Sequence, residues 1–151
     1  MQNDNTPLTA DQTRSLRCVA AMMIPPSQAH QVPGADDDAI FTDIMNSIGQ
    51  DAALVKQALQ DLDTLAAGIF ADCQPAQRQA AAAALQDAGG PPLLALTRVI
   101  TQCYYRDDRV MRSLGMELRP PFPKGFEVEQ GDWSLLDPVR ARPPFYRHPP
   151  E

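Results

Sequence analysis

The stretch Tyr104-Tyr-Arg-Asp-Asp-Arg-Val-Met-Arg-Ser-Leu-Gly115 divides this 151-residue chain into two parts of different composition. Before it, segment after segment shows apolar residues at the spacing of amphipathic helices. After it, residues 116–151 contain eight prolines and five of the chain's nine aromatic residues. The sequence therefore predicts an all-α fold, with a compact bundle of about five to six helices in residues 1–115. A long extended, Pro-rich C-terminal arm is expected in residues 116–151.

The expected helices have recognisable ends. Thr9 and Gln12 form a capping box for the first helix, which Pro25-Pro26 ends. The acidic run Asp36-Asp37-Asp38 resembles a metal site, but carboxylates also favour the positive N-terminal end of a helix. We interpret the run as the start of the second helix.

The third helix, about Asp51 to Phe70, has the strongest apolar periodicity and is the expected centre of the core. Its polar face carries Asp61 and Asp63, whose two-residue spacing does not place them side by side on a helix. Both are therefore interpreted as solvated rather than as a catalytic pair. Pro75 and Gly89 bound a fourth, alanine-rich helix.

The last two helices meet at the dividing stretch. Pro91-Pro92 begins the fifth helix, and Tyr104-Tyr105 ends it. Asp107 or Asp108 caps a short sixth helix, which Gly115 closes.

Charge and cysteine content exclude several classes of function. The net charge is −6, and residues 1–72 carry ten acidic against three basic residues, whereas nucleic-acid binding needs a concentrated basic face. Cys18, Cys73 and Cys103 lie far apart and are expected to be buried thiols, with Cys18 and Cys103 on apolar helix faces. The only histidines are His30 and His148, so no metal site is predicted.

No enzyme motif for nucleotide, nucleophile or zinc chemistry occurs in the chain. The cluster Tyr104–Arg109 is the densest polar group and supports an alternative function, a stand-alone small helical enzyme or ligand-binding protein. A helix–helix corner, in which Asp caps, Arg pairs and Tyr packs, explains the same residues without catalysis.

The N-terminal residues contain no positively charged region followed by an apolar region, and no twin arginine. A cytoplasmic protein is therefore expected. A periplasmic location would follow if a signal had been removed or if the chain were exported together with a partner.

The arm combines prolines with large aromatic side chains, although a disordered tail is normally poor in aromatic residues. An extended segment has little core of its own, so these side chains need another surface. Aromatic residues and arginine dominate interface energetics, and proline lowers the entropy lost on docking. The sequence leaves two surfaces open: the chain's own helices, or a second protein.

The dividing stretch and its sequel resemble the gluconate 2-dehydrogenase subunit 3 family. The similarity lies in Tyr104-Tyr-Arg-Asp-Asp-Arg-Val110 with Leu114-Gly115, and in Arg119-Pro-Pro-Phe-Pro-Lys-Gly-Phe126. It extends to Leu8-Thr-Ala-Asp-Gln12 and Met23-Ile-Pro-Pro26 near the start, and to Leu136-Asp-Pro-Val-Arg140 and Tyr146-Arg147 near the end. Many members carry a twin-arginine signal, which this sequence lacks.

The resemblance implies a small non-catalytic auxiliary (gamma) subunit with a chaperone-like role. Its partner would be a large FAD-binding dehydrogenase subunit of the glucose-methanol-choline type, with a cytochrome c subunit as a further candidate. FAD is expected in that partner and no cofactor in this chain. The expected interface residues are Tyr104, Tyr105, Arg109, Phe122, Phe126, Trp133, Arg140, Phe145 and Tyr146.

Overall fold

The computed structural model describes residues 7–119, 124–125, 127 and 129–143. The chain forms two compact units, Met1–Leu118 and Arg119–Glu151, and each is described by itself. All regular elements of the described residues are helical, and one isolated antiparallel bridge joins Ser27 to Val32. The predicted all-α class is confirmed.

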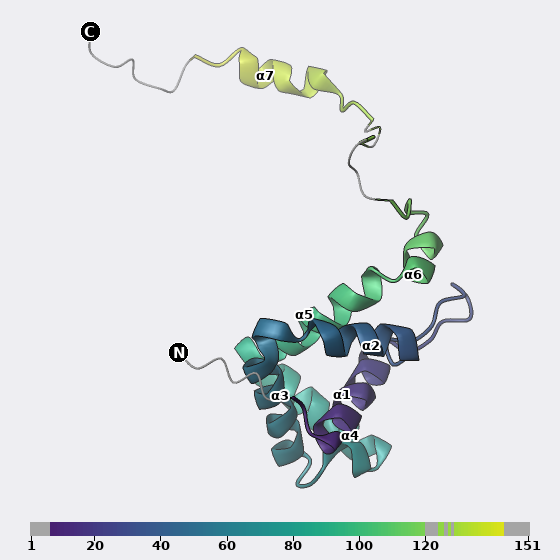
Figure 1. Cartoon of the computed structure of the whole chain (residues 1–151). Helices are drawn as coiled ribbons and strands as arrows, with labels where there is room; N and C mark the ends of the chain where they lie inside the picture. Colours follow the sequence, from purple (N-terminus) through teal and green to yellow (C-terminus); the bar gives the residue numbers. More distant parts are fainter. Residues whose placement is uncertain (1–6, 120–123, 126, 128, 144–151) are drawn as a thin grey trace. The chain divides into compact units, whose positions relative to one another are not determined.

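Helices joined by turns build the described part of the first unit (Figure 1). In chain order they are α1 (Ala10–Met23), α2 (Asp38–Ser47), the 3-10 helix η1 (Gly49–Asp51), α3 (Ala52–Leu65), the 3-10 helix η2 (Phe70–Asp72), α4 (Pro75–Ala88), α5 (Pro91–Tyr105) and α6 (Asp108–Ser113). None of the helices in the described ranges is long and apolar enough to cross a membrane.

The starts of α1, α2 and α6 lie where the local capping signals predict them. The Thr9 hydroxyl accepts a hydrogen bond from the Gln12 backbone N–H at 3.2 Å, and the Gln12 amide oxygen accepts one from the Thr9 N–H at 3.0 Å. Asp37 caps α2 through the Ala39 N–H at 3.1 Å, and Asp107 caps α6 through the Arg109 N–H at 2.9 Å. The capping interpretation of the Asp36–Asp38 run is confirmed.

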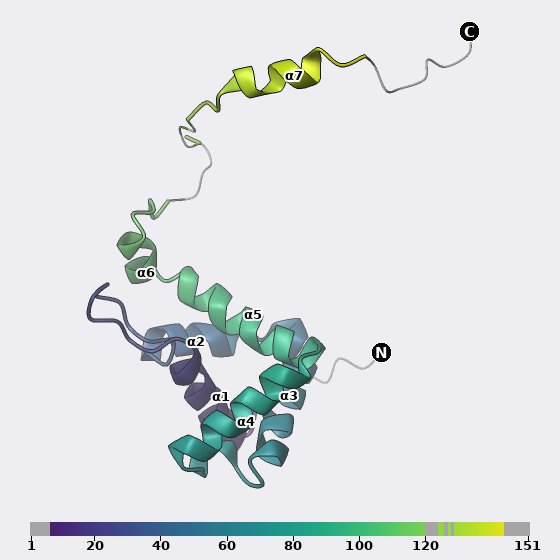
Figure 2. The ribbon, with the colours of Figure 1, turned by 180° about the vertical axis from the view of Figure 1, so that it is seen from behind.

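The core of the first unit is centred on α3, which packs against α1, α4 and α5 (Figures 1 and 2). The buried face of α3 consists of Val55, Ala58, Leu59 and Leu62. The opposing face of α5 buries Ala95, Leu96, Val99, Ile100, Cys103 and Tyr104. α5 also packs against α2, so it contacts both the central helix and the second helix of the body.

The predicted length of the third helix is wrong, because α3 ends at Leu65 rather than near Phe70. Ala67 has a φ of +54°, a left-handed conformation that an α-helix cannot continue through. The Asp63 carboxylate then accepts a hydrogen bond from the Phe70 backbone N–H at 2.8 Å. Asp63 therefore bridges a turn instead of being solvated, and the turn brings Phe70 into the core, where it is fully buried.

In the described part of the second unit, a 3-10 helix, η3 (Trp133–Leu136), leads directly into α7 (Asp137–Arg140). The prediction of an extended chain is wrong for this helical segment, Trp133–Arg140. The Asp132 carboxylate caps the segment by accepting from the Ser134 N–H at 3.0 Å. Pro138 lies in the first turn of α7, where a missing backbone N–H is tolerated.

Candidate functional site

The expected interface residues of the helical body lie where α5 meets α6. Tyr104 and Tyr105 end α5, and Arg109 lies in the first turn of α6. The two tyrosine rings meet edge to face, with centroids 5.2 Å apart and an interplanar angle of 86°. Tyr104 is 5% exposed and belongs to the core, whereas Tyr105 is 55% exposed. Of this pair, Tyr105 has the solvent-exposed ring.

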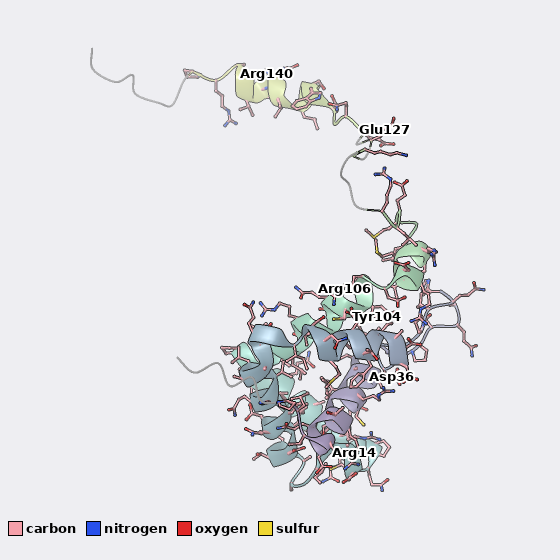
Figure 3. The ribbon with its side chains drawn as sticks, viewed as in Figure 1. Arg14, Asp36, Tyr104, Arg106, Glu127 and Arg140 are labelled. Carbon is pink, nitrogen blue, oxygen red and sulfur yellow. The ribbon has the colours of Figure 1, made fainter. Side chains whose placement is uncertain are left out.

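Arg106, the residue after α5, fastens this helix to α2 (Figure 3). Its Nε and Nη2 donate to the two carboxylate oxygens of Asp43 at 2.5 and 2.6 Å, and Nη2 also donates to the Ser47 hydroxyl. The Arg106 hydrogen bond is the main cause of the lowered pKa of Asp43. A bidentate pair of this kind fixes the angle between two elements as well as neutralising both charges.

Arg109 joins the N-terminal ends of α6 and α2. It donates to Asp107, which caps α6, at 3.0 Å, and to Asp37, which caps α2, at 2.7 Å. Hydrogen bonds from Arg109 hold the pKa of both carboxyl groups below their ordinary value. One guanidinium thus connects two helix caps that are far apart in sequence.

The polar corner, residues 104–109 with Asp37 and Asp43, is therefore arranged as a helix junction. A general base works best when its pKa lies near the operating pH, but the carboxyl groups of Asp37, Asp43 and Asp107 have lowered pKa values and already accept from arginine. Burial raises the pKa of the Tyr104 phenol, so it stays protonated at neutral pH. These are properties of stable links rather than of an acid/base site.

The expected interface residues of the arm that the structure describes are Trp133 and Arg140, at the two ends of the helical segment. Trp133 is 59% exposed, and its indole N–H donates to the Gln130 side chain at 3.2 Å. Arg140 lies 3.4 Å from Asp137 within the same segment. Four further expected residues, Phe122, Phe126, Phe145 and Tyr146, lie outside the described residues.

The sequence analysis missed the apolar residues that lie between these two ends. Leu135, Leu136 and Val139 are 74%, 40% and 55% exposed on the helical segment. The signal that could have found the segment is local: Asp132 precedes Ser134 by two positions, as an N-cap does, and Pro138 follows at a position that starts a helix. This segment is the largest group of exposed apolar side chains close together in sequence among the described residues.

The described residues contain no cluster of metal-ligating side chains. No group of three or more His, Cys, Asp or Glu side chains in the described ranges could hold a metal ion. Cys18, Cys73 and Cys103 are free thiols; the expected burial is confirmed for Cys103 and is wrong for Cys18 and Cys73, which are partly exposed. His148 lies outside the described residues, whereas His30 lies exposed in the loop after α1.

Comparison with protein-family models, with curated proteins and with solved structures finds no match for this chain.

Proposed function

We propose that this chain is a small, non-catalytic auxiliary subunit that binds a large FAD-binding dehydrogenase subunit through its C-terminal arm. Its role would be to stabilise that subunit or assist its folding. The identity of the partner comes from the family resemblance of the motifs around Tyr104–Gly115 and Arg119–Phe126. The observation that carries the binding role is the exposed apolar surface of the helical segment Trp133–Arg140.

The helical segment is too short to be stable by itself in water, because isolated helices need about 12–15 residues to be even marginal. It nevertheless places Trp133, Leu135, Leu136 and Val139 at 40–74% exposure. Full burial of one such side chain contributes about 1.5–3 kcal/mol. A protein surface that covered these residues would both stabilise the helix and gain this free energy.

The composition of the segment is that of an interface centre with a charged edge. Tryptophan and arginine are the residue types most often found at binding hot spots, and both occur here as Trp133 and Arg140. Asp137 and Arg140 pair with each other at the surface, which leaves the apolar side chains as the main source of affinity. Recognition of an apolar helix face by a groove on the partner is a common mode of binding.

The polar corner contributes differently in this proposal. Its arginines and carboxylates are already engaged with one another, so it supplies a rigid end to the helical body rather than free binding groups. Tyr105, half exposed beside it, is the corner residue best able to touch a partner.

The test co-expresses the tagged full-length chain with an FAD-binding dehydrogenase subunit of the glucose-methanol-choline type from the same genome. We expect co-purification of a flavin-containing complex, and a loss of at least about tenfold in recovered flavoprotein for Trp133→Ser and for Leu135→Ser. Leu94→Ser is the matched control, because Leu94 is also a strongly exposed residue, 67%, but lies on α5 of the body. All variants are checked for unchanged helicity by circular dichroism.

Two results would refute the proposal. One is the absence of any complex when both subunits are soluble. The other is a complex that survives both arm substitutions but is lost in Leu94→Ser, which would move the binding surface to the helical body.

A further inference from the structure

A second feature of the body concerns Arg78, on the first turns of α4. Six other arginines of the described body, Arg14, Arg17, Arg98, Arg106, Arg109 and Arg112, each have a carboxylate oxygen within 2.5–3.8 Å. No such partner appears for Arg78 among the described residues. Its Nη1 donates to the sulfur of Cys18 at 3.3 Å, and its Nε is buried with no hydrogen-bond partner.

This arrangement leaves most of the hydrogen-bonding capacity of the guanidinium unused. Arginine carries five N–H donors in a planar fork, and a thiol sulfur is a weak acceptor. Because Nε is buried, an oxyanion in the pocket would accept from the terminal Nη1 and Nη2 groups, whose N–H bonds can reach two oxygens in parallel.

The surroundings of Arg78 leave room for such a group. An open pocket of about 480 Å³ lies between α1 and the start of α4, lined among others by Arg17, Cys18, Met22, Pro75 and Arg78. Pro75 is the first residue of α4, so the positive N-terminal end of that helix borders the pocket. Its apolar lining suits a ligand with a short hydrocarbon body.

Two other charged residues of the pocket affect how tightly it can bind an anion. Arg17 is held in place by Asp38 at 2.7 Å and lies over the Phe41 ring at 4.4 Å, so it adds positive charge but is not free to move. Asp36 also lines the pocket, and its negative charge opposes an anion. We therefore expect weak binding, with half-saturation in the millimolar range.

We propose that the Arg78 pocket, formed by α1 and the first turns of α4, binds the oxyanion of a small ligand, a carboxylate or a phosphate group, with Arg78 as the principal donor. The site is independent of the arm and of any partner subunit. Arg78 grips the two oxygens through its fork, and Arg17 contributes long-range attraction.

The experiment titrates the full-length, ¹⁵N-labelled protein and follows the arginine Nε–H signals by NMR at constant ionic strength, with chloride as the balancing anion. Butyrate and inorganic phosphate are the two probes, and the one that binds more tightly identifies the source of the oxyanion. We expect a saturable shift of the Arg78 signal. The Arg112 signal serves as the control in the same sample, because Arg112 is an exposed arginine with a distant partner, 3.8 Å away.

Two variants of Arg78 distinguish bidentate hydrogen bonding by the guanidinium from simple attraction by a positive charge. Binding, followed by backbone amide shifts near Cys18 and Pro75, should weaken at least about tenfold in Arg78→Gln and also in Arg78→Lys, since lysine keeps the charge but not the bidentate geometry. The proposal is overturned if neither probe gives saturation, if Arg112 responds as strongly as Arg78 in the wild-type protein, or if Arg78→Gln binds normally. The comparison within the wild-type protein decides the matter even if a variant does not fold.

Discussion

Replacing Asp63 with alanine should weaken the fold of the body, whereas the same change at Asp61 should leave it nearly unchanged. Both residues are aspartates near the end of α3, and both side chains are partly exposed. They differ in what they contact. Asp63 accepts a hydrogen bond from the Phe70 backbone N–H at 2.8 Å, while Asp61 accepts one from the exposed side chain of Gln57 at 2.9 Å.

The size of the effect follows from two opposing terms. Removing the Asp63 carboxylate leaves the partly buried Phe70 N–H without its acceptor, which costs about 1–3 kcal/mol. It also removes a negative charge from the C-terminal end of α3, where such a charge is unfavourable by about 0.3–1 kcal/mol. The first term wins, and the expected net loss in the free energy of unfolding is about 1–2 kcal/mol. Asp61→Ala should stay within about 0.5 kcal/mol of the wild type.

Urea unfolding monitored by circular dichroism measures the difference, with the slope of the transition as a check that the unfolded states are alike. Asp63→Asn is the informative third variant, since it keeps an oxygen acceptor and removes the charge. It should recover part of the loss. The reasoning fails if Asp63→Ala unfolds at the same urea concentration as Asp61→Ala, or if Asp63→Asn is as unstable as Asp63→Ala.

Three further predictions use the same body. Gly34→Ala should cost about 1–3 kcal/mol, because a Cβ there would lie 2.5 Å from the Asp36 carboxylate and 3.1 Å from the Ile24 carbonyl oxygen, whereas Gly68→Ala has open space and should be neutral or slightly stabilising in the same urea assay. Acid should destabilise the body. The lowered pKa values of Asp37, Asp43 and Asp107 contribute stability that is fully present above the ordinary aspartate pKa and is lost as the pH falls through the folded-state values. Unfolding midpoints measured at decreasing pH from pH 6 test this, and midpoints that stay constant down to pH 3 would contradict it. A thiol reagent should label Cys18 and Cys73 in the native protein but Cys103 only after unfolding, because Cys103 is 1% exposed and burial raises the pKa of its thiol. Mass spectrometry of the labelled peptides gives the order of labelling, and early labelling of Cys103 would place it outside the core.

The helix starts could be predicted from sequence because each depends on residues a few positions apart. Each capping side chain bonds a backbone N–H no more than three residues away, as seen for Thr9 with Gln12, Asp37 before α2 and Asp107 before α6. The end of α3 could not be predicted in this way, because the apolar period continues through residues that the chain uses in a turn. That turn depends on a left-handed alanine, Ala67, and on a bond between Asp63 and a residue seven positions later.

The ion pairs between distant residues could not be predicted from the sequence either. The sequence showed acidic residues around the second helix and arginines around residue 106, but not which would meet. Arg106 reaches Asp43 across 63 positions, and Arg109 reaches Asp37 across 72. Only the packing of α5 against α2 brings these groups together, and no local pattern in the sequence predicts that packing.

The contrast between the corner and the arm bears on where binding energy can come from. A side chain that is already buried or paired in the fold can contribute to association only if it first loses its contacts within the chain. Tyr104, 5% exposed, is in this position, so its expected role at an interface is to support Tyr105 from inside. Trp133 and Leu135 are still largely exposed to solvent, so covering their apolar surface would contribute favourable free energy to binding. If the proposed function holds, Tyr104→Phe should therefore leave complex formation unchanged, whereas Trp133→Ser should reduce it at least about tenfold.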